Sequence, residues 1–242
     1  MYFNQKIKIQ NITISKRRCF VVAEISANHC GSLGKLKKLI LRLKKINVDA
    51  VKIQAYEANT ITINSDNSDF KIPKGNAWTK FKNLYRLYQK AETPFDWYNE
   101  IFDFCKINKV IVFASVFDIS SLNLLEKIGC PAYKIASPEI TDIPLISAVA
   151  KTKKPIILSN GLGSIKDLSL AIRIVKKERN KNLIVLKCTS SYPAPINEIN
   201  LEMMNFINKK YKVLTGYSDH TLKYHTAIHS ASLGAVMLER HV

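Results

Sequence analysis

Short runs of aliphatic and β-branched residues alternate along the chain with longer stretches in which apolar residues recur at helical spacing. Several of the short runs are apolar at every position, which is typical of strands covered on both faces of a parallel sheet. The predicted strands cover residues 20–25, 50–54, 110–114, 132–136, 155–158, 183–187, 212–215 and 235–238.

Start and stop signals delimit the helices between these strands. Thr93 and Pro94 form a cap-and-first-turn pair, and Ser164 with Asp167 three residues later forms a weak capping box. Gly234 follows the last apolar stretch, as expected at the C-terminus of a helix. The clearest predicted helices cover residues 33–46, 95–107, 165–177 and 222–233.

This alternation predicts an α/β fold whose parallel strands are joined by right-handed crossovers. The number of strand–helix units predicts a single (β/α)8 TIM barrel over residues 1–242. An open doubly wound sheet is the alternative, but no GxGxxG motif follows the first strand. The last predicted strand ends close to the last residue, so we expect the eighth helix to be missing.

Two segments lie outside this repeat. Residues 1–18 predict a β-hairpin that plugs the N-terminal end of the barrel. Residues 62–89 form a long insertion after the second strand, with a helix of its own near residues 79–89. Long loops on a barrel are usually functional lids.

The chain is strongly basic, because 37 lysines and arginines against 19 acidic residues give a net charge of +18. Such a charge raises the question of nucleic-acid binding. The lysines are spread over the predicted solvent faces of helices, without interleaved stacking aromatics, so we expect no nucleic-acid partner. A lysine-rich composition or an anionic substrate explains the charge equally well.

Cysteine usage and the chain's apolar runs favour a cytoplasmic protein. The five cysteines are scattered, with no CxxC pair, which argues against both a disulfide framework and a cysteine zinc site. A reducing cytoplasm fits this pattern best, and buried packing is the expected role of Cys188. The N-terminal residues lack the apolar stretch of a signal peptide, and no run is long enough to span a membrane.

Polar residues gather at the C-terminal ends of the predicted strands, where barrel enzymes carry their active sites. Lys52, Lys134 and Lys187 occupy positions that can point inward, and a buried lysine needs an anionic partner. That partner is either a glutamate or a phosphate or carboxylate of a ligand, and a lysine Schiff base is a further possibility. The available glutamates are Glu24, Glu139 and Glu239, and the other strand-end candidates are Asn28, His29, Gln54, Ser115, Phe117, Ser137, Ser159, Asn160, Ser190, Tyr192, Ser218, Asp219 and Arg240.

Two histidines end consecutive strands, which would bring them together in a closed barrel. His220 and His241 with carboxylate neighbours suit Mn²⁺, Fe²⁺ or Zn²⁺, and the alternative is a pair of hydrogen-bonded histidines. His225 and His229 follow at helical spacing, and we expect both on the surface.

Seven segments, in order along nearly the whole chain, resemble the sialic acid synthase (NeuB-type) family. Within that family the segments SANH (26–29), NSDNSDFKI (64–72) and LYRLYQKAETPFDW (84–97) are most similar to the pseudaminic acid synthases. The seven segments are AEISANHCGSL (23–33), VKIQ (51–54), PAYKIAS (131–137), KPIILSNG (154–161), LKCTSSYP (186–193), GYSDHTL (216–222) and LGAVMLERH (233–241).

The resemblance implies a (β/α)8 barrel that condenses phosphoenolpyruvate with the open-chain aldehyde of an acetamido sugar and releases phosphate. For the pseudaminic branch the sugar is 2,4-diacetamido-2,4,6-trideoxy-altrose; N-acetylneuraminate synthase, legionaminate synthase and an inactive homologue are the alternatives. A divalent metal, Mn²⁺ or Mg²⁺, is the implied cofactor and polarises the aldehyde oxygen.

The same resemblance assigns roles to individual residues. His220 and His241 match the metal ligands, and Glu24, Lys134 and Glu139 match the catalytic residues. Glu24 matches a residue beside the metal, and Glu139 one that faces the sugar and can move a proton. The residues that match substrate-binding positions are Lys52, Gln54, Ser115, Phe117, Ser137, Ser159, Asn160, Ser190, Tyr192 and Ser218.

Some positions depart from the family pattern. Val116 stands in place of a proline, Asn160 in place of a threonine, and Ser190 where sialic acid synthases often carry asparagine. The family continues with an eighth helix and a small antifreeze-like (SAF) domain and is homodimeric. We expect the SAF domain to be absent from this chain, and with it the dimer strap and part of the sugar site.

Overall fold

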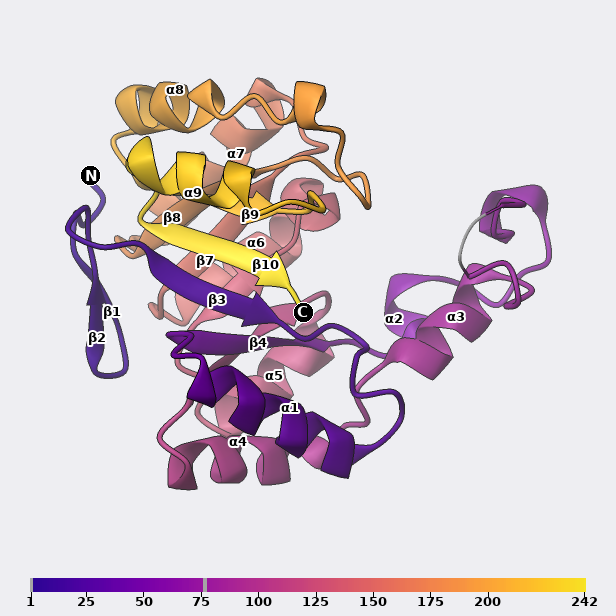
Figure 1. Ribbon diagram of the computed structural model, residues 1–242. Helices are drawn as coiled ribbons and strands as arrows, with labels where there is room; N and C mark the ends of the chain where they lie inside the picture. Colours follow the sequence, from indigo (N-terminus) through magenta and orange to yellow (C-terminus); the bar gives the residue numbers. More distant parts are fainter. Residues whose placement is uncertain (1, 76–77) are drawn as a thin grey trace.

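Eight parallel strands close into a barrel in the described part of the chain, with β10 pairing β3 (Figure 1). The computed structural model describes residues 2–75 and 78–242. The strands pair in chain order, which confirms the predicted TIM barrel over the open sheet. They are β3 (Phe20–Glu24), β4 (Ala50–Ala55), β5 (Ile111–Val116), β6 (Tyr133–Ile135), β7 (Ile156–Asn160), β8 (Leu183–Cys188), β9 (Leu214–Asp219) and β10 (Met237–His241).

A helix on the outer surface follows each strand from β3 to β9, and β10 ends one residue before the end of the chain. The capping box predicted for the helix at residues 165–177 is present, because the Asp167 amide donates to Ser164 Oγ at 3.2 Å. Gly234 follows the C-terminus of the last helix, as predicted, and its φ is +90°. The barrel helices are α1 (Leu33–Lys45), α4 (Trp97–Ile107), α5 (Ile119–Lys127), α6 (Ile143–Lys151), α7 (Ile165–Lys177), α8 (Glu202–Tyr211) and α9 (His225–Ser232).

The last two strands extend further than predicted. β9 continues to Asp219 and β10 to His241, so their polar ends are strand residues rather than loop residues. The prediction stopped where the apolar run stopped, but the ladder continues, with Ser218 opposite Glu239. Backbone pairing therefore fixes these side chains at the C-terminal end of the barrel.

The N-terminal hairpin forms as predicted and lies at the N-terminal ends of the strands (Figure 1). It consists of β1 (Ile7–Ile9) and β2 (Ile12–Ile14), paired antiparallel. Ile7, Ile9 and Ile14 are buried in the main apolar core, so the hairpin covers the end of the barrel opposite the candidate site.

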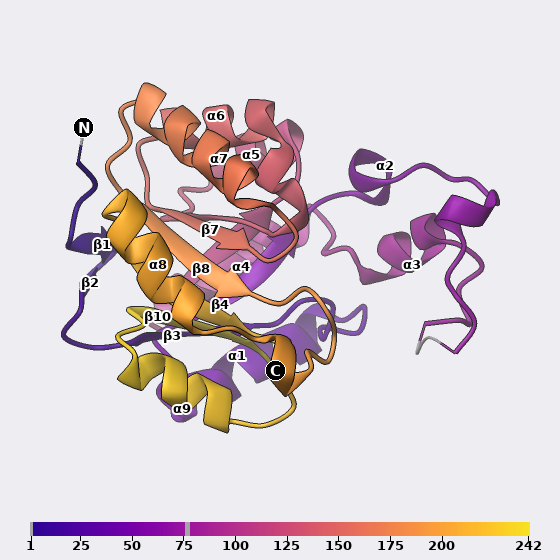
Figure 2. The same ribbon diagram turned by 90° about the horizontal axis from the view of Figure 1, so that it is seen from above.

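The insertion between β4 and α4 projects from the barrel at the C-terminal side of the strands (Figure 2). It contains α2 (Ala58–Ile61), the 3-10 turn η1 (Ser68–Phe70) and α3 (Leu84–Ala91). Its own helix begins later than predicted, at Leu84, and the predicted insertion includes residues 76–77, which lie outside the described residues. Two further 3-10 turns, η2 (Pro138–Thr141) and η3 (Ile196–Glu198), follow β6 and β8.

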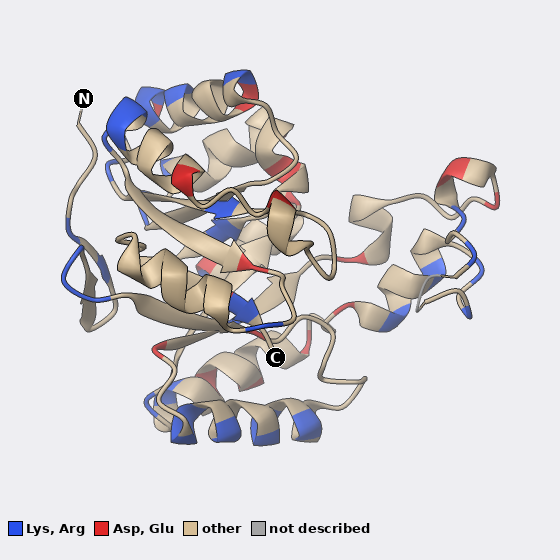
Figure 3. Ribbon diagram, turned by 45° about the horizontal axis from the view of Figure 1, so that its top comes forward, with Lys and Arg blue, Asp and Glu red and all other residues tan. Residues whose placement is uncertain are grey.

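Positive charge is spread over the outer helices and the hairpin (Figure 3). On α1 the exposed Lys35, Lys38, Lys44 and Lys45 face away from the barrel, as predicted for the solvent faces of the helices. His225 and His229 are exposed on α9, also as predicted. Among the helices that the structure describes, none is both long and apolar enough to cross a membrane.

Candidate functional site

The polar ends of the strands surround a cavity of about 170 Å³ at the C-terminal end of the barrel. Strand alternation directs these side chains inward, because every second residue of a barrel strand faces the interior. The cavity is lined by Lys52, Gln54, Ser115, Lys134, Ala136, Ser137, Pro138, Ser159, Leu162, Cys188, Ser190, Tyr192, Ser218, His220, Glu239 and His241.

Two lysines and two glutamates form a buried charge cluster at the base of this cavity. Lys134 Nζ lies 2.7 Å from Glu239 Oε1, and Lys52 Nζ lies 3.7 Å from the same oxygen. Lys52 also contacts the Glu24 carboxylate and donates to Ser115 Oγ at 2.6 Å. All four charged residues are at most 3% exposed, so this cluster supplies the glutamate partners expected for Lys52 and Lys134.

The pKa values of these groups reflect burial and mutual attraction. Burial opposes ionisation of Glu239, but the charges of Lys134 and Lys52 hold the pKa of its carboxyl below the ordinary value. Burial would lower the pKa of Lys52, and the Glu239 and Glu24 carboxylates reverse that shift and raise it. Burial and the neighbouring Lys52 charge lower the pKa of Lys134, which makes Lys134 the more readily neutralised of the two amines.

Hydroxyl and backbone donors gather beside the lysines. The backbone N–H groups of Gly161 and Leu162 donate to Ser137 Oγ at 2.9 and 2.8 Å. Ser190 Oγ lies 3.3 Å from the same oxygen, and Ser159 Oγ is buried without a hydrogen-bond partner among the described residues. Buried polar groups normally have partners, so an unpaired hydroxyl in a cavity indicates a ligand position. Together with the lysines, these groups can bind an anion.

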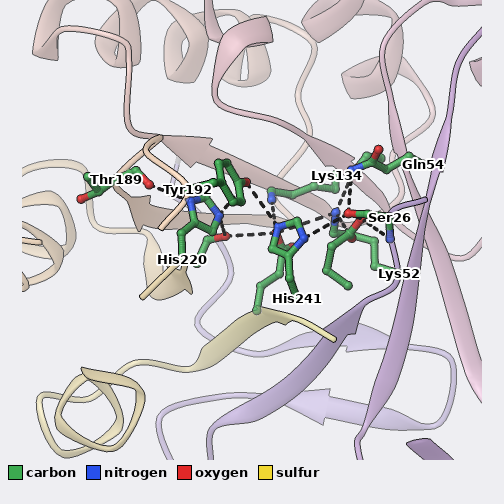
Figure 4. Close-up of polar contacts among 12 residues, drawn as sticks. Ser26, Lys52, Gln54, Lys134, Thr189, Tyr192, His220 and His241 are labelled. Atoms are coloured by element: carbon green, nitrogen blue, oxygen red, sulfur yellow. Dashed lines mark hydrogen bonds and ion pairs between the residues drawn. The ribbon is translucent and has the colours of Figure 1, made fainter. Parts of the chain in front are cut away.

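Two histidine nitrogens converge on one point at the mouth of the cavity (Figure 4). The Nε2 atoms of His220 and His241 lie 2.9 and 3.3 Å from the phenol oxygen of Tyr192. The Tyr192 ring stacks on His220 with centroids 4.0 Å apart, and the two imidazole centroids are 5.3 Å apart. The strand order thus brings the two histidines together, as their positions at the ends of consecutive strands predicted.

Hydrogen bonds on the opposite ring nitrogens leave both Nε2 atoms without a proton. His220 Nδ1 lies 2.6 Å from the Thr189 carbonyl, which can only accept, so Nδ1 carries the hydrogen. Burial lowers the pKa of His220 to about 4 and also lowers that of His241, so both rings are neutral at pH 7. The Tyr192 hydroxyl has one proton for two such nitrogens, and this donor set fits a divalent metal ion. No group of three or more His, Cys, Asp or Glu residues fit to hold a metal occurs among the described residues, so further ligands would be water or substrate.

Comparison with known proteins agrees with this arrangement. Residues 39–242 match the NeuB family. The pseudaminic acid synthase of Campylobacter jejuni is 40% identical over 235 residues, which cover 97% of this chain and 68% of that protein. The pseudaminic acid synthase of Helicobacter pylori is 41% identical, over 91% of this chain and 64% of that protein. The crystal structure of N-acetylneuraminic acid (sialic acid) synthetase from Leptospira borgpetersenii, in complex with citrate, has a TM-score of 0.86 at 29% identity, covering 99% of this chain and 79% of that one.

The chain belongs to the NeuB family. This finding confirms the resemblance that the seven sequence segments indicated. The chain is therefore an enzyme. Most of the site residues assigned from those segments line one cavity. Glu24 does not line it, but it contacts Lys52, which does.

Besides Glu24, three of the assigned residues do not line the cavity. Asn160 is buried, but its neighbour Ser159 faces the interior, and adjacent strand residues point to opposite faces. Phe117 and Glu139 follow β5 and β6 and lie at the rim. Burial raises the pKa of Glu139 to about 7, and its Oε2 atom is buried without a hydrogen-bond partner among the described residues.

The expectation that three lysines point inward is wrong for Lys187. Its side chain is half-buried, and Nζ donates to the Cys188 carbonyl and to Thr189 Oγ1. Cys188, the next residue of β8, lines the cavity, so strand alternation turns Lys187 away from it. Cys188 itself is buried, as predicted, although it packs at the cavity wall.

Several residues of the site had no role in the sequence analysis. Ser26 contacts His241, Glu24 and Gln54. On the rim, the Tyr56 ring contacts Phe117 and Tyr88, with centroid distances of 5.4 and 6.1 Å. Tyr88 belongs to the insertion helix α3, so the insertion borders the site. The position of Ser26 two residues after a strand-end glutamate was a usable signal, whereas the approach of Tyr88 depends on how the insertion folds back.

Proposed function

We propose that this chain condenses phosphoenolpyruvate with an acetamido sugar aldehyde, and that the product is pseudaminic acid. The observation that carries the proposal is the pairing of a lysine-lined anion site with two unprotonated histidine nitrogens in one cavity. About 40% identity to named pseudaminic acid synthases supports that branch over the legionaminic and sialic acid branches.

The lysines and hydroxyls of the cavity would bind phosphoenolpyruvate. Lys52 and Lys134 attract the phosphate and carboxylate, and the hydroxyls of Ser137, Ser159 and Ser218 supply hydrogen bonds. The four buried charges of the cluster sum to zero, so an incoming anion gains little from them unless a cation accompanies it. This balance supports a divalent metal at the neighbouring histidines.

His220 and His241 would hold that metal, Mn²⁺ or Mg²⁺, which polarises the sugar aldehyde oxygen when bound. The anion site orients C3 of phosphoenolpyruvate toward the aldehyde carbon, where the new carbon–carbon bond forms. Water then adds to C2, and phosphate leaves. Glu139, with a pKa near neutrality, can hold or release the proton that this sequence moves at the sugar.

Release of inorganic phosphate tests the proposal directly. The chain would be given phosphoenolpyruvate and Mn²⁺ with 2,4-diacetamido-2,4,6-trideoxy-altrose, with the legionaminic acid precursor, or with N-acetylmannosamine. We expect phosphate release with the altrose derivative and none from a Lys134→Met variant. Release only with another sugar would move the enzyme to that branch.

A lysine imine mechanism on the same barrel makes a different prediction. Borohydride would then trap a covalent adduct with substrate at Lys134, and turnover would not need a divalent metal. Trapping of such an adduct would overturn the proposed mechanism, as would full activity in the presence of a metal chelator.

A further inference from the structure

The Ser26 hydroxyl joins the histidine pair to the buried charge cluster. Ser26 Oγ lies 3.0 Å from His241 Nδ1 and donates to Glu24 Oε1 at 3.0 Å (Figure 4). Gln54 Nε2 donates to the same hydroxyl at 3.3 Å. Glu24 in turn contacts Lys52, so one hydroxyl connects a proposed metal ligand to the groups proposed to bind phosphoenolpyruvate.

The hydrogens available to this contact determine which ring nitrogen of His241 is protonated. The single hydroxyl proton of Ser26 goes to the Glu24 carboxylate, which can only accept. Ser26 Oγ must therefore accept from His241, and the imidazole hydrogen lies on Nδ1. Nε2 then keeps its lone pair, directed at the point that it shares with His220 Nε2. The Thr189 carbonyl has the same effect on His220.

The backbone at Ser26 is unfavourable for a residue with a side chain. Its φ is +50°, in the left-handed region that glycine adopts readily. A glycine would fit this turn without strain but would lack the hydroxyl. The Ser26 backbone N–H also donates to Glu24 Oε1 at 3.0 Å, so the turn places both the amide and the hydroxyl on one carboxylate oxygen.

We propose that Ser26 is a positioning residue: its hydroxyl holds His241 with Nε2 unprotonated and aimed at the cavity, and thereby sets the affinity of the histidine pair for a divalent cation. This inference rests on the proposed role of His220 and His241 as metal ligands. Outer partners of metal-bound histidines typically change affinity by about 10- to 100-fold when they are removed.

Ser26→Gly is the informative variant, because it removes the hydroxyl and relieves the backbone. We expect Mn²⁺ affinity, measured by titration calorimetry or by the electron paramagnetic resonance of free Mn²⁺, to fall about tenfold or more. The melting temperature should stay the same or rise. Ser26→Thr keeps the hydroxyl in a strained turn, so it should lower the melting temperature and retain Mn²⁺ binding near the wild-type level.

Two further measurements separate positioning from a general structural effect. Nitrogen-15 spectra of the imidazoles without metal should show His241 protonated on Nδ1 in the wild type and a mixture of tautomers in Ser26→Gly. Asn47→Gly relieves a similar φ of +60° at an exposed position just after α1, and it should leave Mn²⁺ affinity unchanged.

The outcomes distinguish this inference from the proposed metal site. If His220→Ala and His241→Ala bind Mn²⁺ as tightly as the wild type, the metal site itself is wrong. If both histidine variants lose binding but Ser26→Gly binds Mn²⁺ like the wild type, only the role of Ser26 is overturned.

Discussion

At the scale of single residues, the buried cluster of Lys52, Lys134, Glu24 and Glu239 is balanced, and each charge depends on the others. Taking ions out of water costs several kcal/mol per ion, so the cluster persists because its charges compensate one another at short range. Losing one partner leaves a buried charge that is no longer fully compensated. Such a cluster contributes little net stability, but each single substitution within it is strongly destabilising.

Lys134→Met should therefore lower the free energy of unfolding by about 3 kcal/mol, since it removes the nearer of the two cations that compensate Glu239. The double variant Lys134→Met/Glu239→Gln removes both charges and should recover part of that loss. Urea unfolding of each variant measures the effect. Lys37→Met breaks an exposed pair with Glu100 and provides the control, with an expected loss below about 1 kcal/mol. A double variant no more stable than the single one would contradict this coupling.

Glu139 makes stability depend on pH. Burial raises its pKa from 4.5 to about 7 in the folded protein. Below pH 4.5 both states hold the proton; between 4.5 and 7 the unfolded chain releases it and the folded protein does not. The unfolded state then binds fewer protons, so the free energy of unfolding falls as pH rises through this window, by roughly 3 kcal/mol.

Glu139→Gln cannot ionise and should lack this decrease. We expect the variant to become more stable relative to the wild type as the pH rises from 4.5 to 7, measured by urea unfolding at several pH values. Glu202→Gln, at an exposed position on α8, is the matched control. A stability difference between Glu139→Gln and the wild type that is constant across this range would disprove the assignment.

At the scale of elements, the sequence predicted the order of strands and helices well but placed the ends of most strands too early. Apolar runs stop near Thr215 and Leu238, whereas backbone pairing continues to Asp219 and His241. The inner face of a barrel turns polar where it lines a site, so the hydrophobic signal ends before the strand does. The rule that sites lie at strand ends still identified most cavity residues.

Residues that act through tertiary contacts were harder to find from the sequence. Ser26 meets His241 across 215 positions of the chain, and only closure of the barrel through β3 and β10 brings them together. Tyr88 reaches the rim because His29 anchors the end of α3, through a contact of 3.2 Å between its Nε2 atom and the Ala91 carbonyl. Neither contact has a periodic signature in the sequence.

Closure between β9 and β10 requires Gly216. A Cβ atom there would lie 2.3 Å from the Met237 carbonyl oxygen, a backbone atom that moves only with its strand. Gly216→Ala should therefore separate the strands that carry His220 and His241. We expect the free energy of unfolding to drop by about 2–3 kcal/mol and Mn²⁺ binding to weaken.

Gly34→Ala tests the same substitution where space is available. Its nearest atom outside the helix backbone is Ser32 Oγ at 3.8 Å. Gly34 is the second residue of α1, where alanine is favoured over glycine by less than about 1 kcal/mol. Thermal unfolding should thus show opposite shifts for the two variants. Equal shifts for both would mean that the close approach of β9 and β10 is not limiting.

At the scale of the whole molecule, the net charge of +18 lies outside the candidate site. The buried cluster is neutral, so the excess positive charge lies on the outer helices, the hairpin and the loops (Figure 3). Like charges spread over a surface repel one another and oppose the compact state. The same field attracts anions from a distance, which suits a substrate such as phosphoenolpyruvate.

Self-repulsion of the surface charge and its attraction of anions predict opposite responses to salt, one in the melting temperature and the other in the rate of substrate association. Raising NaCl from about 20 to 300 mM shortens the Debye length to below about 10 Å, so self-repulsion weakens and the melting temperature should rise. The association rate of phosphoenolpyruvate, followed by stopped flow, should fall over the same range because steering is screened. Lys35→Glu/Lys38→Glu lowers the net charge by four units on the exposed face of α1 and should reduce both salt responses. A melting temperature that falls with salt would show that specific ion pairs, rather than the net charge, dominate the electrostatics of the fold.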